Sequence, residues 1–335
     1  MGLPQTSVFF LGGLCALGLF VGCDAKTKEK KVEAEKALLP PSKNPTHLYI
    51  PQKKAGDASI DVRDAQNHIA QDIDFGLAHG HVRKSRCPQE MVLVSDSFCI
   101  DRYEVSLVDK ESSRSLSPHY PPSQEQTARL FERWLRKAPR SRRSLGRLLP
   151  VPEPPAFQLA ENFSPKARSQ AEQIPSGYLS RKTAELACEN AGKRLCHREE
   201  WQRACRGENQ TTFPYGNTYQ AGVCNVHRQT HPSQLLHGNS SKHHLDPRLG
   251  LAHDNEGTLL RPTGATSRCV SRWGNDAIYD MVGNLDEWID EPSGAFLGGF
   301  FSRATRKGCD ASIDVHSPAY LDYSLGTRCC MDDPL

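Results

Sequence analysis

Short apolar runs separated by polar turns are the main pattern of the chain from Cys87 onward. The first run reads MVLVSDSFCIDRYEV, in which two groups of Val, Leu, Phe, Ile and Tyr flank the polar residues 95–97. This pattern is typical of two β-strands joined by a turn. Cys87 and Cys99 flank the predicted hairpin and could link its two ends.

A longer helical pattern occupies part of residues 125–147. Pro139 ends the pattern, and four apolar residues before it recur at helical spacing: Leu130, Phe131, Trp134 and Leu135. Arginine and lysine residues surround these positions and continue beyond Pro139. One interpretation is a packed helix with a solvated face and a basic loop. The other is a surface that contacts anionic lipid head groups or polysaccharide.

Two further helices are predicted within residues 183–206. The first ends near Gly192 and places four small residues on one side: Ala184, Ala187, Cys188 and Ala191. The second begins near His197 and brings together Trp201, Ala204 and Cys205. After Gly207 the chain has many turns and only short strands. The chain therefore has few periodic segments and many turns, in keeping with its 25 glycines and 23 prolines.

The N-terminus predicts export. Residues 7–22 carry no charge, and the run is too short to span a bilayer comfortably, as in the apolar part of a signal peptide. The run ends in LFVGC, which resembles a bacterial lipobox and implies lipidation of Cys23. We therefore expect a signal peptide over 1–22 and a lipid-anchored flexible tether over 23–86, which is rich in Lys, Glu, Ala and Pro. The alternatives are an ordinary signal peptide or an uncleaved anchor.

Export agrees with the cysteine content. The chain has 12 cysteines in 335 residues, and ten remain without Cys15 and Cys23. An even number outside the cytosol favours disulfides, whose connectivity the sequence alone does not fix. We expect the protein in the cell envelope, periplasmic or surface-exposed, on the inner or the outer membrane. The net charge of +3 gives no argument for nucleic-acid binding, so none is expected.

Six sequence blocks in order resemble the formylglycine-generating-enzyme (sulfatase-modifying factor) family. They are CIDRYEVS, AGKRLCHREEWQRACRG, FPYGNTY, AIYDMVGNLDEW, FLGGFFSRATRKGC and DYSLGTRCC. The resemblance implies the C-type-lectin-like α+β fold of that family. It places a family domain at residues 87–335, with a variable basic insertion at about residues 109–174 that matches the family poorly.

The resemblance also implies a chemistry that this chain departs from. Members of the family oxidise a protein cysteine to formylglycine with dioxygen, using two thiolates that bind Cu(I) a few residues after a glycine pair. Here Gly298 and Gly299 supply the glycines, but Arg303 and Gly308 occupy the expected thiol positions, with Cys309 next to the second. A guanidinium is a permanent cation and cannot replace a thiolate.

Two functions from different classes follow. The first is a catalytically degenerate lipoprotein that acts in binding or structure at the envelope, with an envelope protein or a polysaccharide as partner. The alternative is a copper-dependent formylglycine-generating oxidase. Kinship transfers a fold more safely than an activity, and the sequence names no ligand.

The resemblance further implies bound calcium, because Ca²⁺ prefers oxygen ligands in tight loops. The first site would use the carboxylates of Asp280 and Glu287 and the carbonyls of Gly283 and Leu285. The alternative is that Asp280 and Glu287 cap turns or pair with arginines. A second, more loosely matched site would use Asn225, the Val226 carbonyl and either Asp254 or Asn255.

Disulfides are the expected role of the ten remaining cysteines. Cys188 and Cys329 match positions that are linked in the family. Cys87–Cys99 is a local pair, and Cys224–Cys269 could close an irregular loop. Cys205 is expected to reach Cys309, which leaves Cys196–Cys330.

Two smaller expectations concern polar residues. Arg102 and Glu104 are expected to form an internal ion pair. Six histidines gather within residues 227–253, where Pro232, Gly238 and Asn239 indicate an irregular loop: His227, His231, His237, His243, His244 and His253. A solvated loop is the favoured interpretation, and a transition-metal site is the alternative.

Overall fold

The computed structural model describes residues 86–333. The described residues all belong to one compact unit. The predicted signal peptide, the lipidation site Cys23 and the tether as far as residue 85 lie outside the described residues. Within residues 86–333, no helix combines the length and the apolar character needed to cross a bilayer.

The predicted hairpin is confirmed and forms one side of a four-stranded sheet. Strands β1 and β2 pair in register from Met91↔Asp101 to Val94↔Phe98. Between them, Ser95 and Asp96 adopt positive φ angles of 53° and 52°, a conformation that short polar residues tolerate in turns. The strand order is β1-β2-β14-β5, with β1 at Met91–Val94, β2 at Phe98–Asp101, β14 at Cys329–Asp332 and β5 at Arg194–Leu195.

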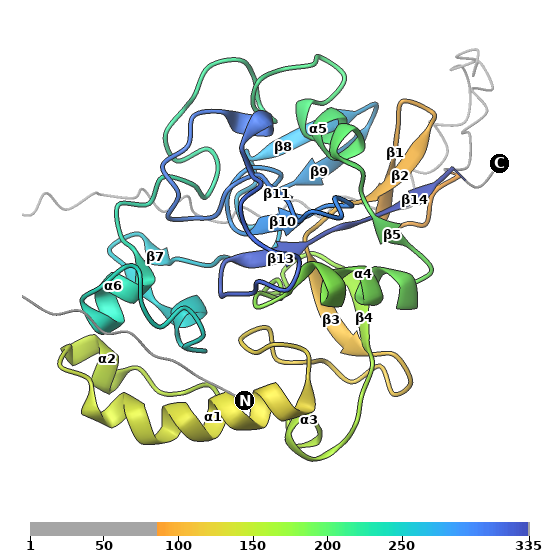
Figure 1. The fold of residues 1–335 in the computed structure, drawn as a ribbon. Helices are drawn as coiled ribbons and strands as arrows, with labels where there is room; N and C mark the ends of the chain where they lie inside the picture. The colour runs from red at the N-terminus through yellow and green to blue at the C-terminus, as the bar shows by residue number, and fades with distance from the viewer. Residues whose placement is uncertain (1–85, 334–335) are drawn as a thin grey trace, which may run out of the picture. The chain divides into compact units, whose positions relative to one another are not determined.

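A second sheet of four short strands has the order β12-β11-β10-β13. Its bounds are Asp286–Trp288 for β10, Phe296–Leu297 for β11, Ser312–Ile313 for β12 and Leu325–Thr327 for β13. Strands β10 and β13 pair in parallel, with Glu287 opposite Gly326. Only Arg328 separates β13 from β14, so the two sheets share one stretch of chain, as Figure 1 shows.

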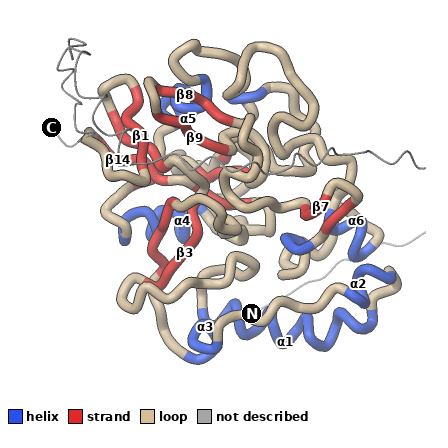
Figure 2. The backbone as a smooth tube through the Cα atoms, turned by 180° about the vertical axis from the view of Figure 1, so that it is seen from behind, coloured by secondary structure: helices blue, strands red, loops and turns tan. Residues whose placement is uncertain are grey.

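The basic insertion leaves and re-enters the fold through one antiparallel pair. Strand β3 (Val105–Asp109) pairs with β4 (Pro165–Ser169). Four short elements lie between them: α1 (Gln124–Lys137), a 3₁₀ turn at Ala138–Arg140, α2 (Ser144–Leu148) and α3 (Ala156–Ala160). These helices form one edge of the described unit in both views (Figures 1 and 2). The buried Trp134 fixes α1, and its Nε1–H donates to the Leu245 carbonyl at 3.1 Å.

The other two predicted helices are also confirmed. Helix α4 spans Arg181–Asn190 and begins with a capping box between Ser180 and Thr183. Helix α5 spans Arg198–Arg206, and the Glu200 carboxylate accepts from the His197 N–H at 2.9 Å. Gly192 and Gly207, with φ of 72° and 65°, follow the two helices where the chain must turn away.

The histidine-rich segment differs from the expected irregular loop, because it contains helix α6 (Pro232–His237). Proline at the first helical position has a suitable fixed φ, and Gly238 ends the helix in the left-handed region. The remaining elements are short: Leu249–Leu251 and Gly308–Asp310 as 3₁₀ turns, with β6 (His253–Asp254), β7 (Gly257–Thr258), β8 (Val270–Trp273) and β9 (Asp276–Tyr279).

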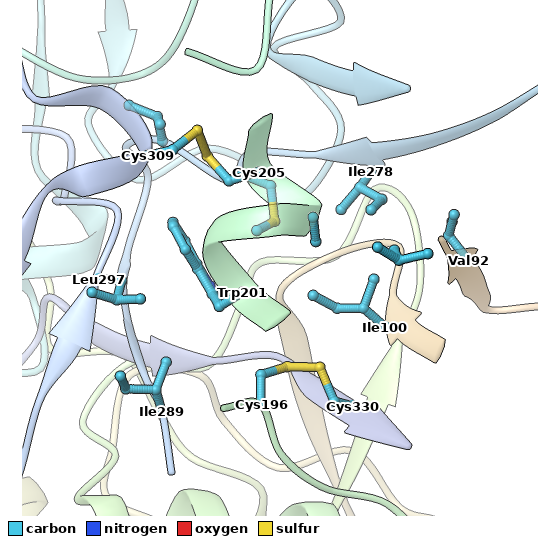
Figure 3. Packing of buried hydrophobic residues seen from close by; sticks show 14 of the residues in the cluster. Val92, Ile100, Cys196, Trp201, Cys205, Ile278, Ile289, Leu297, Cys309 and Cys330 are labelled. Carbon is cyan, nitrogen blue, oxygen red and sulfur yellow. A yellow bond between two sulfur atoms is a disulfide. The ribbon is translucent and has the colours of Figure 1, made fainter. Parts of the chain in front are cut away.

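Five disulfides link these elements through the core. They join Cys87–Cys99, Cys188–Cys329, Cys196–Cys330, Cys205–Cys309 and Cys224–Cys269, which are the five expected pairs. Figure 3 shows two of them, Cys205–Cys309 and Cys196–Cys330, in the same buried cluster as the fully buried Trp201. Cys329 and Cys330 are adjacent, so β14 is held from both sides, by α4 and by the residue that follows β5.

Candidate functional site

A buried ion pair lies where the two sheets meet. Arg328 Nε and Nη2 donate to the two carboxylate oxygens of Glu287, both at 2.7 Å. Trp201 Nε1 from α5 donates to the same carboxylate at 2.6 Å. The guanidinium also donates to the Asp101 carbonyl at 3.2 Å and to the Tyr279 carbonyl at 2.9 Å. The pair therefore joins β10, α5, β2 and β9 to the C-terminal strands, and Glu287 follows the predicted alternative of pairing with an arginine.

Two more carboxylates are buried beside this pair. Glu104 accepts from Asn284 Nδ2 at 2.6 Å and from the Leu285 N–H at 2.9 Å. Asp280 accepts from the Gly264 N–H at 2.7 Å. Burial, with Asp280 and Glu287 close by, raises the pKa of Glu104 well above its usual value. Burial likewise raises the pKa of Asp280 to about 6.

The expected ion pair between Arg102 and Glu104 is wrong. Arg102 instead donates to Asp276 at 2.7 Å and to the Ala277 carbonyl at 3.0 Å. Sequence reasoning missed the role of Glu104, because its partners lie about 180 residues away along the chain.

The first expected calcium site has oxygen donors of the right kind. Asp280 and Glu287 lie in one buried acidic cluster with Glu104, and the fully buried Arg328 is its main counter-charge. A cation bound here would compete with protonation of Glu104 and Asp280, because burial raises the pKa values of both carboxyl groups. Glu287 is the least available donor, because Arg328 and Trp201 already engage it. Within residues 86–333, no group of three His, Cys, Asp or Glu side chains is arranged as a ready metal cage.

Two residues of the second expected calcium site, Asn225 and Asp254, have different partners in the structure. Asn225 Oδ1 is buried without a hydrogen-bond partner among the described residues. Its Nδ2 group donates to the Leu259 carbonyl at 2.8 Å and to Asn284 Oδ1 at 3.0 Å. Asp254 instead forms an ion pair with Arg228. The structure thus brings Asn225 next to the first acidic cluster, and engages Asp254 elsewhere.

The positions expected for copper thiolates do not fit a soft metal. Arg303 Nη2 lies 2.7 Å from Asp286 Oδ2, so a cation and its counter-ion occupy the first position. Gly308 has φ of 56°, and a Cβ there would lie 2.2 Å from the Thr212 carbonyl oxygen, so the second position cannot hold a side chain. Cys309 is linked to Cys205. No thiolate pair is available after the glycine pair.

Asp286, the partner of Arg303, is a strongly perturbed carboxyl group. It is fully buried, and neither carboxylate oxygen has an aligned hydrogen bond within the described part of the chain, although Arg303 approaches closely. Burial raises the pKa of Asp286 to about 7, while Arg303 acts in the opposite direction. Nothing in the sequence pattern marks Asp286 as the partner of Arg303.

The histidines are mainly engaged in packing and local hydrogen bonds. His237 Nε2 lies 2.8 Å from Asp246 Oδ2, and the His237 and His243 rings pack beside Trp134. His231 contacts the Tyr323 hydroxyl at 3.1 Å. His227 lies beside Tyr219, and His253 is exposed on β6. These contacts support a structural role for the segment.

Comparison with known proteins identifies the family of this chain. A family described as "Sulfatase-modifying factor enzyme 1-like domain" matches residues 56–295, a range that ends just before the glycine pair. No curated protein matches the chain. This family match confirms the expected C-type-lectin-like α+β fold with little regular secondary structure.

Several solved structures are similar at low identity. "Major Tropism Determinant P3c Variant" is 16% identical, with 73% of this chain and 53% of that chain covered and a TM-score of 0.37. "Crystal Structure of CarF" is 14% identical, with 70% and 86% covered and a TM-score of 0.34. PvdO from Pseudomonas aeruginosa is 12% identical, with 70% and 80% covered and a TM-score of 0.33. The chain spans about half the length of the tropism determinants.

Asp286→Asn tests the buried carboxylate. Because the folded-state pKa of Asp286 is about 7, the folded domain binds this proton more tightly than the unfolded chain between about pH 4 and pH 7. The contribution of Asp286 to stability is therefore present at low pH and is lost as the pH rises through this window. Urea unfolding should show the variant gaining stability relative to the wild type as the pH rises. The exposed Asp314→Asn serves as the control, and a wild-type-to-variant difference that is constant with pH would contradict the assignment.

Proposed function

The chain belongs to the sulfatase-modifying factor enzyme 1-like family, and we propose that it is a non-catalytic member that acts in binding or structure at the cell envelope. The observation that carries this proposal is the arginine–aspartate pair at the first thiol position. A guanidinium beside a carboxylate offers no soft ligand to Cu(I), whereas two thiolates would.

Two further observations support the loss of catalysis. The backbone at Gly308 excludes any side chain, so a single substitution could not restore the second thiol. All ten cysteines of residues 86–333 are in disulfides, which leaves no free thiol in that range. Family membership alone favours the alternative, a formylglycine-generating oxidase, and that activity would require thiols from a rearranged site.

An aldehyde assay distinguishes the two functions. The purified, oxidised protein is incubated with Cu(I), dioxygen and a sulfatase-type peptide that contains one cysteine, beside an active enzyme of the family. We expect no aldehyde product by mass spectrometry, because no pair of thiolates can hold the metal. Conversion of the peptide well above a protein-free control would refute the proposal.

Attachment to a membrane is the second part of the proposal. The uncharged residues 7–22 and the LFVGC sequence support processing before Cys23 and acylation of its thiol. The lysine- and proline-rich segment that follows would act as a spacer between the bilayer and the family domain. The ligand in this setting would be an envelope protein or a polysaccharide.

Acylation has a direct test. In a bacterial host that modifies lipoproteins, cells are grown with a clickable fatty acid and the protein is then captured. We expect the label on the wild type and on Cys15→Ala, the matched control within the same apolar segment. Cys23→Ala should carry none, because the thiol that accepts the lipid is gone. Equal labelling of Cys23→Ala would exclude this site.

Calcium binding is the third part of the proposal. The buried acidic cluster of Glu104, Asp280 and Glu287 supports a bound cation, as does the unpartnered Asn225 Oδ1. Asp280 and the carbonyls of Gly283 and Leu285 would be its main donors, with Glu287 shared with Arg328. The cation would neutralise charge and brace the loop before β10, which is a structural role.

Calcium should therefore raise the thermal midpoint of the protein over that in a chelator. A ligand at about 100 times its dissociation constant stabilises the folded state by about 2.7 kcal/mol. Asp280→Asn should lose most of this effect, because it removes a charged donor but tolerates the same positive φ of 58°. Asp96→Asn, at φ 52° in the exposed hairpin turn, is the control. A calcium effect that persists in Asp280→Asn would contradict this site.

A further inference from the structure

The insertion concentrates positive charge on one edge of the described unit. Residues 133–152 contain seven basic side chains and no acidic one, in a chain whose net charge is only +3. Six arginines of this stretch are exposed on α1, the 3₁₀ turn, α2 and the loop between the last two. We call them the arginine edge: Arg133, Arg136, Arg140, Arg142, Arg143 and Arg147. Helices α1 and α2 lie along the rim of the unit in both ribbon views (Figures 1 and 2).

Most of this charge is not neutralised within the fold. In the arginine edge, Arg136 alone forms an ion pair with a described carboxylate, namely Glu132. Arg147 donates to the Ser141 carbonyl at 3.0 Å, which leaves its charge uncompensated. An intramolecular role would pair these guanidinium groups, as the fold does for Arg328. Their unpaired state instead suits an anionic partner outside the molecule.

Two exposed leucines accompany the arginines. Leu135 is 50% exposed on α1 and Leu148 is 79% exposed at the end of α2. Only two other large apolar side chains of residues 86–333 are comparably exposed, Leu186 and Val315. The arginine edge therefore combines cations with apolar side chains that a solvated basic loop does not need.

This combination selects one kind of partner. Arginine binds a phosphate group through a planar fork of donors, and apolar side chains beside basic ones can enter the boundary between head groups and acyl chains. An acidic polysaccharide would satisfy the arginines but would leave the leucines in water. We propose that the arginine edge is a membrane-docking surface that binds anionic phospholipids and lays the α1–α2 edge against the bilayer. The surface acts independently of the lipid on Cys23, and with that anchor it would fix the orientation of the domain.

Vesicle binding tests the proposal without the anchor. The mature chain from residue 24 onward, which lacks Cys23, is sedimented with vesicles of phosphatidylcholine alone or of phosphatidylcholine with phosphatidylglycerol. We expect binding only to the anionic vesicles. Raising the ionic strength from about 0.1 M to about 1 M should abolish it, because the Debye length falls from about 10 Å to about 3 Å. Failure of this binding would leave the acylation of Cys23 untouched, so the two proposals fail separately.

Variants locate the surface. Arg140→Gln with Arg142→Gln should weaken binding about thirtyfold, equivalent to about 1 kcal/mol for each arginine near an anionic surface. Arg203→Gln with Arg268→Gln removes the same charge from exposed arginines outside the insertion and should change affinity little. Leu148→Ser should weaken binding several-fold at unchanged charge, which a purely electrostatic contact would not show. Unchanged thermal midpoints would show that every variant is folded.

Three results would overturn the proposal. The first is the absence of sedimentation with anionic vesicles. The second is an equal loss of binding in both double variants, which would reveal a general charge effect. The third is binding to an acidic polysaccharide such as alginate with no binding to anionic vesicles, which would assign the arginine edge to a polymer.

Discussion

The fold depends on a charged pair in its interior, the guanidinium of Arg328 and the carboxylate of Glu287. Moving two charges out of water costs several kcal/mol for each ion, and only close, well-aligned contacts offset that cost. Arg328 meets this condition with two bonds to Glu287 and two to backbone carbonyls. The position is held rigidly because Cys329 and Cys330, the next two residues, are linked to Cys188 and Cys196. The disulfides thus hold the strand at the point where a small displacement would leave an unpaired charge in the core.

The cost of burying charge also affects the acidic residues around the Arg328–Glu287 pair. Glu104 and Asp280 are buried near Glu287, and their pKa values are raised mainly because burial disfavours the ionised form. Protonation and the ion pair with Arg328 both limit this charge. The side-chain amide of Asn284 donates to Glu104 and accepts from Asn225, so both residues belong to one hydrogen-bond network. This network lies beside the buried ion pair. Its stability depends on each buried polar group having a partner more than on any single hydrogen bond.

Local sequence patterns were sufficient to predict the helices and strands. They were not sufficient to predict contacts between residues that are distant in the sequence. The hairpin and the helices α1, α4 and α5 followed from apolar spacing, a polar turn, Pro139 and the helix-ending glycines. The expected disulfides followed from family positions and the order of the remaining cysteines, and they agree with the linked pairs. The partners of Glu104, Arg102 and Arg303 could not be predicted, because each lies on a segment that only the tertiary fold brings near. Helix α6 was missed because six residues are too few for a periodic signal.

The insertion shows how a surface can be added to this fold without disturbing its polar centre. Pairing of β3 with β4 brings the two ends of the insertion together, so its helices extend outward from a closed base. Loop-closure cost grows only slowly with length, so a long insertion on such a base is tolerated. The buried Trp134 then anchors α1 through a hydrogen bond to the Leu245 carbonyl, while the six arginines of the arginine edge are exposed. Neither contact involves the side chains of Arg328 or Glu287, so the arginine edge is built outside the buried ion pair.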